Sequence, residues 1–253
     1  LPLAGHKDNH AGLMTPDQID HLRTQMGIAQ GEEWQPFAGM AELAEDLTAF
    51  IDQVPFRQRI FRHQAPPVAV PEGLGDVSIG QTASTQEVFG KLMAELGRND
   101  SELAGRLVTT SPDVTVSTSL GAWVSRRAVF HGTAREDVFR QHNVASPTRW
   151  RTSPTGQHME LGIAENNLFL LLAALGLAHE TFGARLLPIG TLYDPFICRG
   201  LDALNYACYQ DARFLLVATP SGVTLSPEGG AHQSISTPLI GMGQPGLTYF
   251  EPA

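Results

Sequence analysis

A carboxylate placed just ahead of an apolar helix is the feature that most constrains how this chain can fold. Residues 168–177 have the sequence LFLLLAALGL, and Glu165 comes shortly before them, after Gly162 and the β-branched Ile163. A helix that is apolar all round has to be buried, and this one is too short for a bilayer, which takes about 20 residues. Because burying a carboxylate is costly without a partner, Glu165 is either a helix-start cap or a proton-handling group.

Short apolar runs alternate with helical patterns in the second part of the chain. These patterns predict helix 84–96, strand 107–110, helix 164–180, strand 185–190, helix 196–209 and strand 214–218. The run at 214–218 is apolar throughout, which is typical of a buried strand. Such strands alternating with helices indicate an α/β protein, with a parallel sheet sandwiched by helices. Residues 111–157 are predicted to be irregular and polar.

The first 79 residues have a different pattern. A Thr-Pro pair at residues 15–16 has the order of an N-cap and a first helical residue, and a second helix is expected over residues 40–54. Residues 55–80 contain several prolines and little periodicity, as a linker or a wrapping arm does. We therefore predict two parts, a mobile loop with a helical linker arm at 1–79 and the α/β domain at 80–253.

The composition argues against some classes of function. The chain has 253 residues, and 26 acidic residues against 17 Lys and Arg give a formal net charge of −9. This charge argues against nucleic acid or an anionic membrane as the main partner. Cys198 and Cys208 form no CxxC pair, which disfavours a thiolate metal site and fits a reduced, cytoplasmic setting. The chain starts with Leu-Pro-Leu and both ends look cut, so we expect a fragment or a processed chain.

Polar residues follow three of the predicted strands. They lie in the loops at 110–113, 190–196 and 219–233. Loops at the carboxyl ends of parallel strands are where α/β proteins place their chemistry. We expect these loops to converge with Glu165 on one crevice.

Three motifs in order resemble a known family. Gly-Ile-Ala-Glu at 162–165, the aromatic loop around Phe196 and Glu-Gly-Gly-Ala-His-Gln at 228–233 are similar to the pyrimidine-binding domain of the transketolase-like thiamine diphosphate enzymes. The resemblance is closest to the homodimeric pyruvate dehydrogenase E1 component, with transketolase and deoxyxylulose-phosphate synthase as neighbours. It covers residues 80–250 clearly and residues 1–70 more loosely. It implies the thiamine diphosphate-binding fold for the α/β domain.

The resemblance implies a catalytic role for Glu165. In the family, the matching Glu hydrogen-bonds N1′ of the cofactor's aminopyrimidine, and sharing this proton prepares the thiazolium ring to attack a 2-oxo substrate. Such a Glu has to give and take a proton near neutral pH. An apolar wall, here Ile163 and the Leu-rich helix, is expected to favour its protonated form. The residues alone leave a second interpretation open, a solvated Glu stabilised by the helix dipole.

The resemblance implies roles for five further residues. Phe196 matches the aromatic residue that stacks on the pyrimidine and Tyr193 an active-site Tyr, since a flat cationic heterocycle suits an aromatic platform. His232 matches a His that faces the substrate, and His10 a His on a mobile loop that closes over the bound cofactor. Asp113 matches an Asp near the thiazolium, although the E1 enzymes have a pair of acids where this chain has a proline and one acid. Without the resemblance, a core aromatic, an exposed loop His and a polar-tail His explain the same positions.

The motif that binds the cofactor's diphosphate is missing from the chain. In the family a separate domain holds Mg²⁺ and the diphosphate through Gly-Asp-Gly and a later Asn. We therefore expect no metal ligand in this chain and the Mg²⁺ ligands on a missing domain or a partner chain. The resemblance further implies a homodimer or heterotetramer, and an acyl-carrier E2 component as a possible partner, with neither nucleic acid nor membrane.

The sequence favours part of a thiamine diphosphate-dependent 2-oxo acid decarboxylating dehydrogenase, to which this chain contributes the aminopyrimidine-activating Glu. A transketolase-type two-carbon transferase is the first alternative. Its sugar phosphates need a basic channel, for which the candidates are Arg126, Arg127, Arg135, Arg149 and Arg199. The second alternative is a catalytically idle assembly or regulatory domain, separated from its diphosphate-binding half.

Overall fold

The computed structural model describes residues 4–54, 57, 65–133, 135–136, 141–145 and 150–252. The chain divides into two compact units, Leu1–Ile60 and Phe61–Ala253. The boundary predicted at residue 79, between a linker arm and a pyrimidine-binding domain, is a division by role and stays a prediction.

The first unit contains two helices. α1 (Pro16–Gln25) begins at a capping box, in which the Thr15 hydroxyl accepts the backbone N–H of Gln18 and the Gln18 side chain accepts that of Thr15. A 3₁₀ turn, η1 (Ala41–Leu43), leads into α2 (Ala44–Gln53). Both helices lie where the sequence predicts them. Neither helix buries a residue, so this unit has little core of its own.

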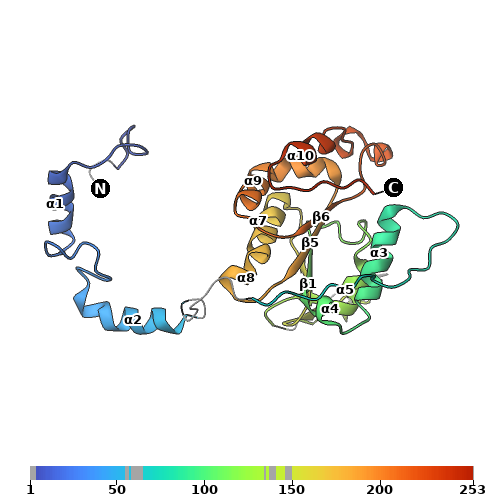
Figure 1. Ribbon diagram of the computed structural model, residues 1–253, viewed down its shortest axis with the longest axis horizontal. Helices are drawn as coiled ribbons and strands as arrows, with labels where there is room; N and C mark the ends of the chain where they lie inside the picture. The colour runs from blue at the N-terminus through green and yellow to red at the C-terminus, as the bar shows by residue number, and fades with distance from the viewer. Residues whose placement is uncertain are drawn as a thin grey trace. The chain divides into compact units, whose positions relative to one another are not determined.

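The second unit is built on a six-stranded sheet (Figure 1). Its strands are β1 (Leu107–Ser111), β2 (Val129–Phe130), β3 (Thr152–Ser153), β4 (His158–Glu160), β5 (Leu187–Leu192) and β6 (Leu215–Ala218). They lie in the order β3-β2-β4-β1-β5-β6, and neighbouring strands pair in parallel. The predicted α/β fold with a parallel sheet is confirmed.

Helices cover both faces of this sheet (Figure 1). One hydrophobic cluster joins β1 to α3 (Thr85–Leu96), α4 (Glu102–Arg106) and α5 (Gly121–Arg127), with Trp123 fully buried. The other joins β5 to α7 (Glu165–Gly176) and α9 (Leu201–Tyr209), with Phe169 fully buried. Burying a large apolar side chain contributes about 1.5–3 kcal/mol, so these clusters fix the helices to the sheet. The shorter elements are α8 (Ala178–Thr181), η2 (Asp194–Gly200), η3 (Ser226–Glu228), η4 (Gly230–His232) and α10 (Thr237–Gly243).

Some details of the sequence prediction are wrong. The run at 214–218 predicts a buried strand, whereas β6 lies at the sheet edge and Leu215 is 62% exposed. Residues 111–157 are not irregular throughout, because they contain α5, β2 and β3. The helix expected at 164–180 is divided into α7 and α8, and the helix expected at 196–209 starts with the 3₁₀ segment η2, which has Pro195 in its first turn. In the described part of the chain, no helix has the length and apolar character needed to cross a membrane.

Candidate functional site

The carboxyl ends of β1, β5 and β6 share one edge of the sheet, because these neighbouring strands are parallel. The segment η2 follows β5 at this edge, and the loop that contains η3 and η4 follows β6. Helix α7, whose first residue is Glu165, packs against both β5 and η2. The structure therefore brings Glu165 to the edge where the sequence predicts a crevice.

Glu165 forms an ion pair with Arg199 of η2. The Arg199 Nη1 donates a hydrogen bond of 2.7 Å to Glu165 Oε1. Glu165 is only 7% exposed, whereas the Arg199 side chain is 52% exposed. The N-cap residue of α7 is Ala164, so Glu165 is not the cap of this helix. Nor is it solvated: it is a nearly buried carboxylate with a cationic partner, in a first helical turn that also stabilises negative charge.

An aromatic platform lies next to this ion pair. The Arg199 guanidinium lies over the Phe196 ring, with its Cζ 4.1 Å from the ring centroid. Tyr193 stacks against Phe196, with the centroids 6.1 Å apart and the planes at 29°. His232 meets the Phe196 ring edge-on at 5.4 Å and the Tyr193 ring at 6.1 Å. Glu165, Tyr193, Phe196 and His232, all proposed from the sequence, thus belong to one connected site with Arg199.

His232 retains unused hydrogen-bonding capacity. Its Nε2 lies 3.6 Å from Glu228 Oε2, within the same Gly-rich loop. Its Nδ1 is buried and has no partner among the described residues. A buried ring nitrogen without a partner is costly, so this atom is suited to a polar group that enters the site.

Asp194 fixes the loop after β6 to the site. Its Oδ2 accepts the backbone N–H of Gly222 at 2.9 Å, and its own N–H donates to the Pro220 carbonyl at 3.3 Å. Asp194 is buried, and its Oδ1 has no partner among the described residues. This role of Asp194 was not predicted from the sequence, although an acid between Tyr193 and Pro195 in a predicted active-site loop was a visible signal.

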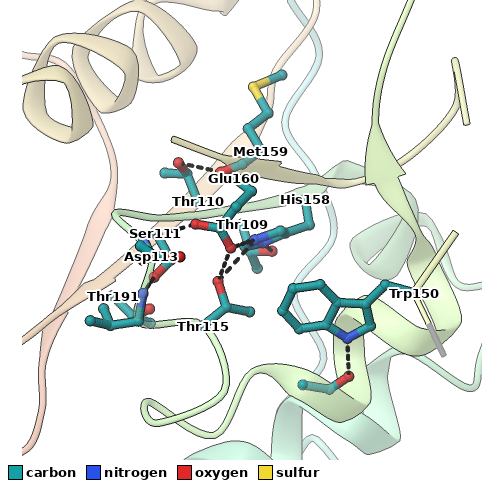
Figure 2. A network of polar contacts seen from close by, with 12 residues as sticks. Thr109, Thr110, Ser111, Asp113, Thr115, Trp150, His158, Met159, Glu160 and Thr191 are labelled. Atoms are coloured by element: carbon teal, nitrogen blue, oxygen red, sulfur yellow. Dashed lines mark hydrogen bonds and ion pairs between the residues drawn. The ribbon is translucent and has the colours of Figure 1, made fainter. Parts of the chain in front are cut away.

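Asp113 belongs to a second polar group at the same edge of the sheet (Figure 2). It lies after β1, is exposed, and donates its backbone N–H to Glu160 Oε1 at 2.8 Å. Glu160 ends β4, the neighbour of β1. The expected position of Asp113 near the thiazolium ring stays a prediction.

The chain is similar in sequence to three curated proteins of one name. The pyruvate dehydrogenase E1 component of Corynebacterium glutamicum is 29% identical over 196 residues, which cover 75% of this chain and 20% of that protein. The one from Mycolicibacterium smegmatis is 24% identical over 203 residues, which cover 76% and 21%. The chain therefore spans about a fifth of the length of the curated relatives it matches. No protein-family model matches it.

Solved transketolase structures are similar to this chain in fold. Transketolase from Pichia stipitis in complex with sedoheptulose 7-phosphate superposes with a TM-score of 0.53 and 16% identity, over 92% of this chain and 34% of that chain. A variant of that enzyme in complex with fructose 6-phosphate gives 0.52 over the same shares. This chain has a transketolase-like fold. The predicted resemblance to the transketolase-like thiamine diphosphate enzymes, near the pyruvate dehydrogenase E1 component, is confirmed.

Ile163 does not form the apolar wall expected beside Glu165. It is 77% exposed, and the charge of Arg199 is the feature that meets the carboxylate. The sequence analysis named Arg199 only as a candidate for a phosphate channel. Its place one turn after Phe196 could have indicated the stacking contact.

His10 lies in the first unit, in an exposed turn. Its expected role on a closing loop stays a prediction. Within the residues that the structure describes, no group of three or more His, Cys, Asp or Glu side chains is arranged to hold a metal ion.

Proposed function

We propose that this chain is part of a thiamine diphosphate-dependent 2-oxo acid decarboxylating dehydrogenase similar to pyruvate dehydrogenase E1 components, and that it holds the aminopyrimidine end of the cofactor. The observation that carries this proposal is the joining of a nearly buried carboxylate, Glu165, to an aromatic platform, Phe196, through one flat cation, Arg199. The sequence relatives support the dehydrogenase over other thiamine enzymes.

The side chains of the site suit an aminopyrimidine. A flat heterocycle that carries a proton needs an aromatic face to stack on and a carboxylate to receive that proton. The Arg199 guanidinium is itself flat and cationic, and it makes both of these contacts. The unpartnered Nδ1 of His232, on the edge of the same platform, adds a polar group for the ligand or the substrate.

Thiamine diphosphate, when bound, supplies the ring carbon that attacks a 2-oxo acid and the electron sink for its decarboxylation. Glu165 would share a proton with pyrimidine N1′. Tyr193 and Phe196 would orient the ring and exclude water from one side of it, and His232 would exchange protons with the substrate.

The rest of the cofactor site is assigned to another part of the assembly. The chain spans about a fifth of the length of its curated relatives. We therefore propose that Mg²⁺ and the diphosphate are held by a further domain or a partner chain, in a homodimer or heterotetramer. His10 would close over the site as part of a lid, Asp113 would lie near the thiazolium ring, and an acyl-carrier E2 component would accept the product.

A transketolase-type transfer has less support. A sugar phosphate needs free arginines, but Arg199 is paired with Glu165 and Arg127 lies 3.7 Å from Asp100. Arg149 lies outside the described residues. Two of the five candidate arginines therefore already lie beside a carboxylate, which weakens the case for a phosphate channel.

Calorimetric titration of thiamine diphosphate and Mg²⁺ tests the proposal. We expect no binding to the chain alone and binding once its diphosphate-binding half is added, followed by CO₂ release from pyruvate. Turnover of a sugar phosphate instead would favour the transferase. Binding without turnover of either substrate would favour the idle domain, and no binding to the folded mixture would contradict the proposal.

A further inference from the structure

A network of polar contacts among β1, β4 and the loop after β1 is centred on His158, the first residue of β4 (Figure 2). His158 is fully buried, and its Nδ1 lies 2.8 Å from the Thr109 hydroxyl. Its Nε2 lies 3.1 Å from the Thr115 hydroxyl and 3.3 Å from Glu160 Oε2. A buried imidazole with partners at both nitrogens has a fixed orientation.

With Glu160 ionised, the hydrogen count of this network determines the direction of its bonds. The Thr115 hydroxyl has one proton and donates it to Glu160 Oε2 at 2.5 Å. Thr115 therefore receives a bond from His158, whose Nε2 must carry a hydrogen. When the ring is neutral, Nδ1 accepts from the Thr109 hydroxyl. When it is protonated, Nδ1 donates to the same oxygen, and the hydroxyl turns toward the Gln157 carbonyl at 3.5 Å. In both cases Glu160 Oε2 accepts the Thr115 hydrogen bond.

The other oxygen of Glu160 holds the loop after β1. Oε1 accepts the backbone N–H of Asp113 at 2.8 Å. Asp113 has a φ of +65°, in the left-handed region, which Asp and Asn adopt more readily than most residues other than glycine. The next residue, Val114, donates its N–H to the Ser111 hydroxyl at 3.3 Å. The hydrogen bond to Glu160 Oε1 therefore helps to fix the backbone of the loop at Asp113.

The electrostatics of the network favour the ionised carboxylate. Burial raises the pKa of Glu160, but hydrogen bonds from His158, Thr115 and the Asp113 N–H outweigh it, so the pKa lies below the usual 4.5. Glu160 therefore keeps its charge, and its two oxygens keep their acceptor roles, at neutral pH.

We propose that Glu160 and His158 are positioning residues that hold Asp113 at the carboxyl edge of the sheet. The network also places the Glu160 carboxylate, from the neighbouring strand β4, beside Asp113. The loop after β1 itself contributes only one acid at this point, Asp113. This inference rests on the proposed function only in giving Asp113 a part in the chemistry, because the hold on the loop needs no cofactor.

NMR of the whole chain without any cofactor tests the hold. The titratable residues that contact Glu160 are His158, on its own strand, and Asp113, whose backbone N–H it accepts and whose side chain is a carboxylate. We therefore use an Asp113→Asn background, which removes that carboxylate, keeps the backbone N–H and tolerates the left-handed backbone. The residue-113 amide signal should titrate below the usual glutamate value of 4.5 as Glu160 takes up a proton. Glu160→Gln should abolish this titration and speed amide exchange at residue 113 by about tenfold.

Matched variants show whether an effect of Glu160→Gln on residue 113 comes from the lost hold on the loop, from the lost charge or from unfolding. Glu72→Gln removes an exposed carboxylate and should leave the titration and the exchange rate unchanged. An unchanged residue-113 amide after Glu160→Gln, with the β1 and β5 amides still protected, overturns the proposal. If Glu160→Gln unfolds the sheet, Thr115→Val and Thr115→Ser test the proposal instead. Amide exchange at residue 113 should be faster in the Val variant, and the Ser variant should restore the parent rate. Equal exchange rates in the two variants overturn the proposal. No thiamine is used, so these outcomes do not depend on the proposed function.

Discussion

Replacing Arg199 by Met should leave the nearly buried carboxylate of Glu165 without its cation. Two unit charges about 4 Å apart attract by about 1 kcal/mol in water and by about 4 kcal/mol at the effective dielectric constant near a protein surface. Glu165 is 7% exposed, which favours the larger value, but the Arg199 side chain is 52% exposed and is screened by solvent. We therefore expect a coupling free energy of about 1–2 kcal/mol between the two residues.

A double-mutant cycle measures this coupling through the free energy of unfolding. It compares Arg199→Met, Glu165→Gln and the double variant in urea, followed by tryptophan fluorescence. Trp34→Phe in all of them removes the tryptophan of the first unit, so that the signal comes from Trp123 and Trp150 of the second. The Met variant keeps an unbranched side chain over the platform, so the cycle isolates the charge.

A surface pair provides the matched control. Arg213 lies 3.0 Å from Asp211, with both side chains largely exposed, so Arg213→Met should cost less than about 0.5 kcal/mol. A coupling below about 0.3 kcal/mol in the Glu165 cycle would refute the reasoning, because a nearly buried carboxylate should lose more than an exposed one. The reasoning would also be refuted if Arg213→Met lowered the free energy of unfolding as much as Arg199→Met does.

The structure supports two further predictions. Gly156→Ala should lower the free energy of unfolding by about 1–3 kcal/mol, because the new Cβ would overlap the backbone of Val129. At Gly105 a new Cβ meets nothing within 4 Å, so Gly105→Ala should be neutral or slightly stabilising. Thermal unfolding of the two variants measures this difference. For Glu160, the folded-state pKa lies below 4.5, so the stability that this carboxylate contributes is present above pH 4.5 and is lost as the pH falls through the folded value. Glu160→Gln should therefore have lower stability at neutral pH and a flatter acid limb, and an unchanged acid limb would contradict the assigned network.

The longer elements of the fold could be predicted from the sequence, because each was long enough to show a period. Strands β1 and β5 and helix α7 begin within two residues of their predicted starts, and α9 ends at its predicted last residue. Strands β2 and β3 have two residues each and β4 has three, too few to show alternation. Their pairing depends on strands that are distant in the sequence, so residues 111–157 could not be read correctly from local pattern.

The candidate site could be predicted only in part. The convergence of Glu165, Phe196 and His232 follows from parallel strands, whose carboxyl ends share one edge. The partners that hold these groups could not be predicted, because the Glu165–Arg199 bond joins residues 34 positions apart and the Asp113–Glu160 bond joins residues 47 positions apart. Contacts of this kind depend on packing rather than on local pattern.

The most direct test of the proposed function is the rate of 2-oxo acid decarboxylation by the enzyme assembled from this chain, its diphosphate-binding half, thiamine diphosphate and Mg²⁺. Glu165→Ala should lower this rate by about 10²–10⁴-fold, the usual contribution of a positioned acid–base group, while the circular dichroism spectrum stays that of the parent. The exposed Glu72→Ala should keep the full rate. Full turnover by the folded Glu165→Ala variant would contradict the claim that this carboxylate activates the cofactor.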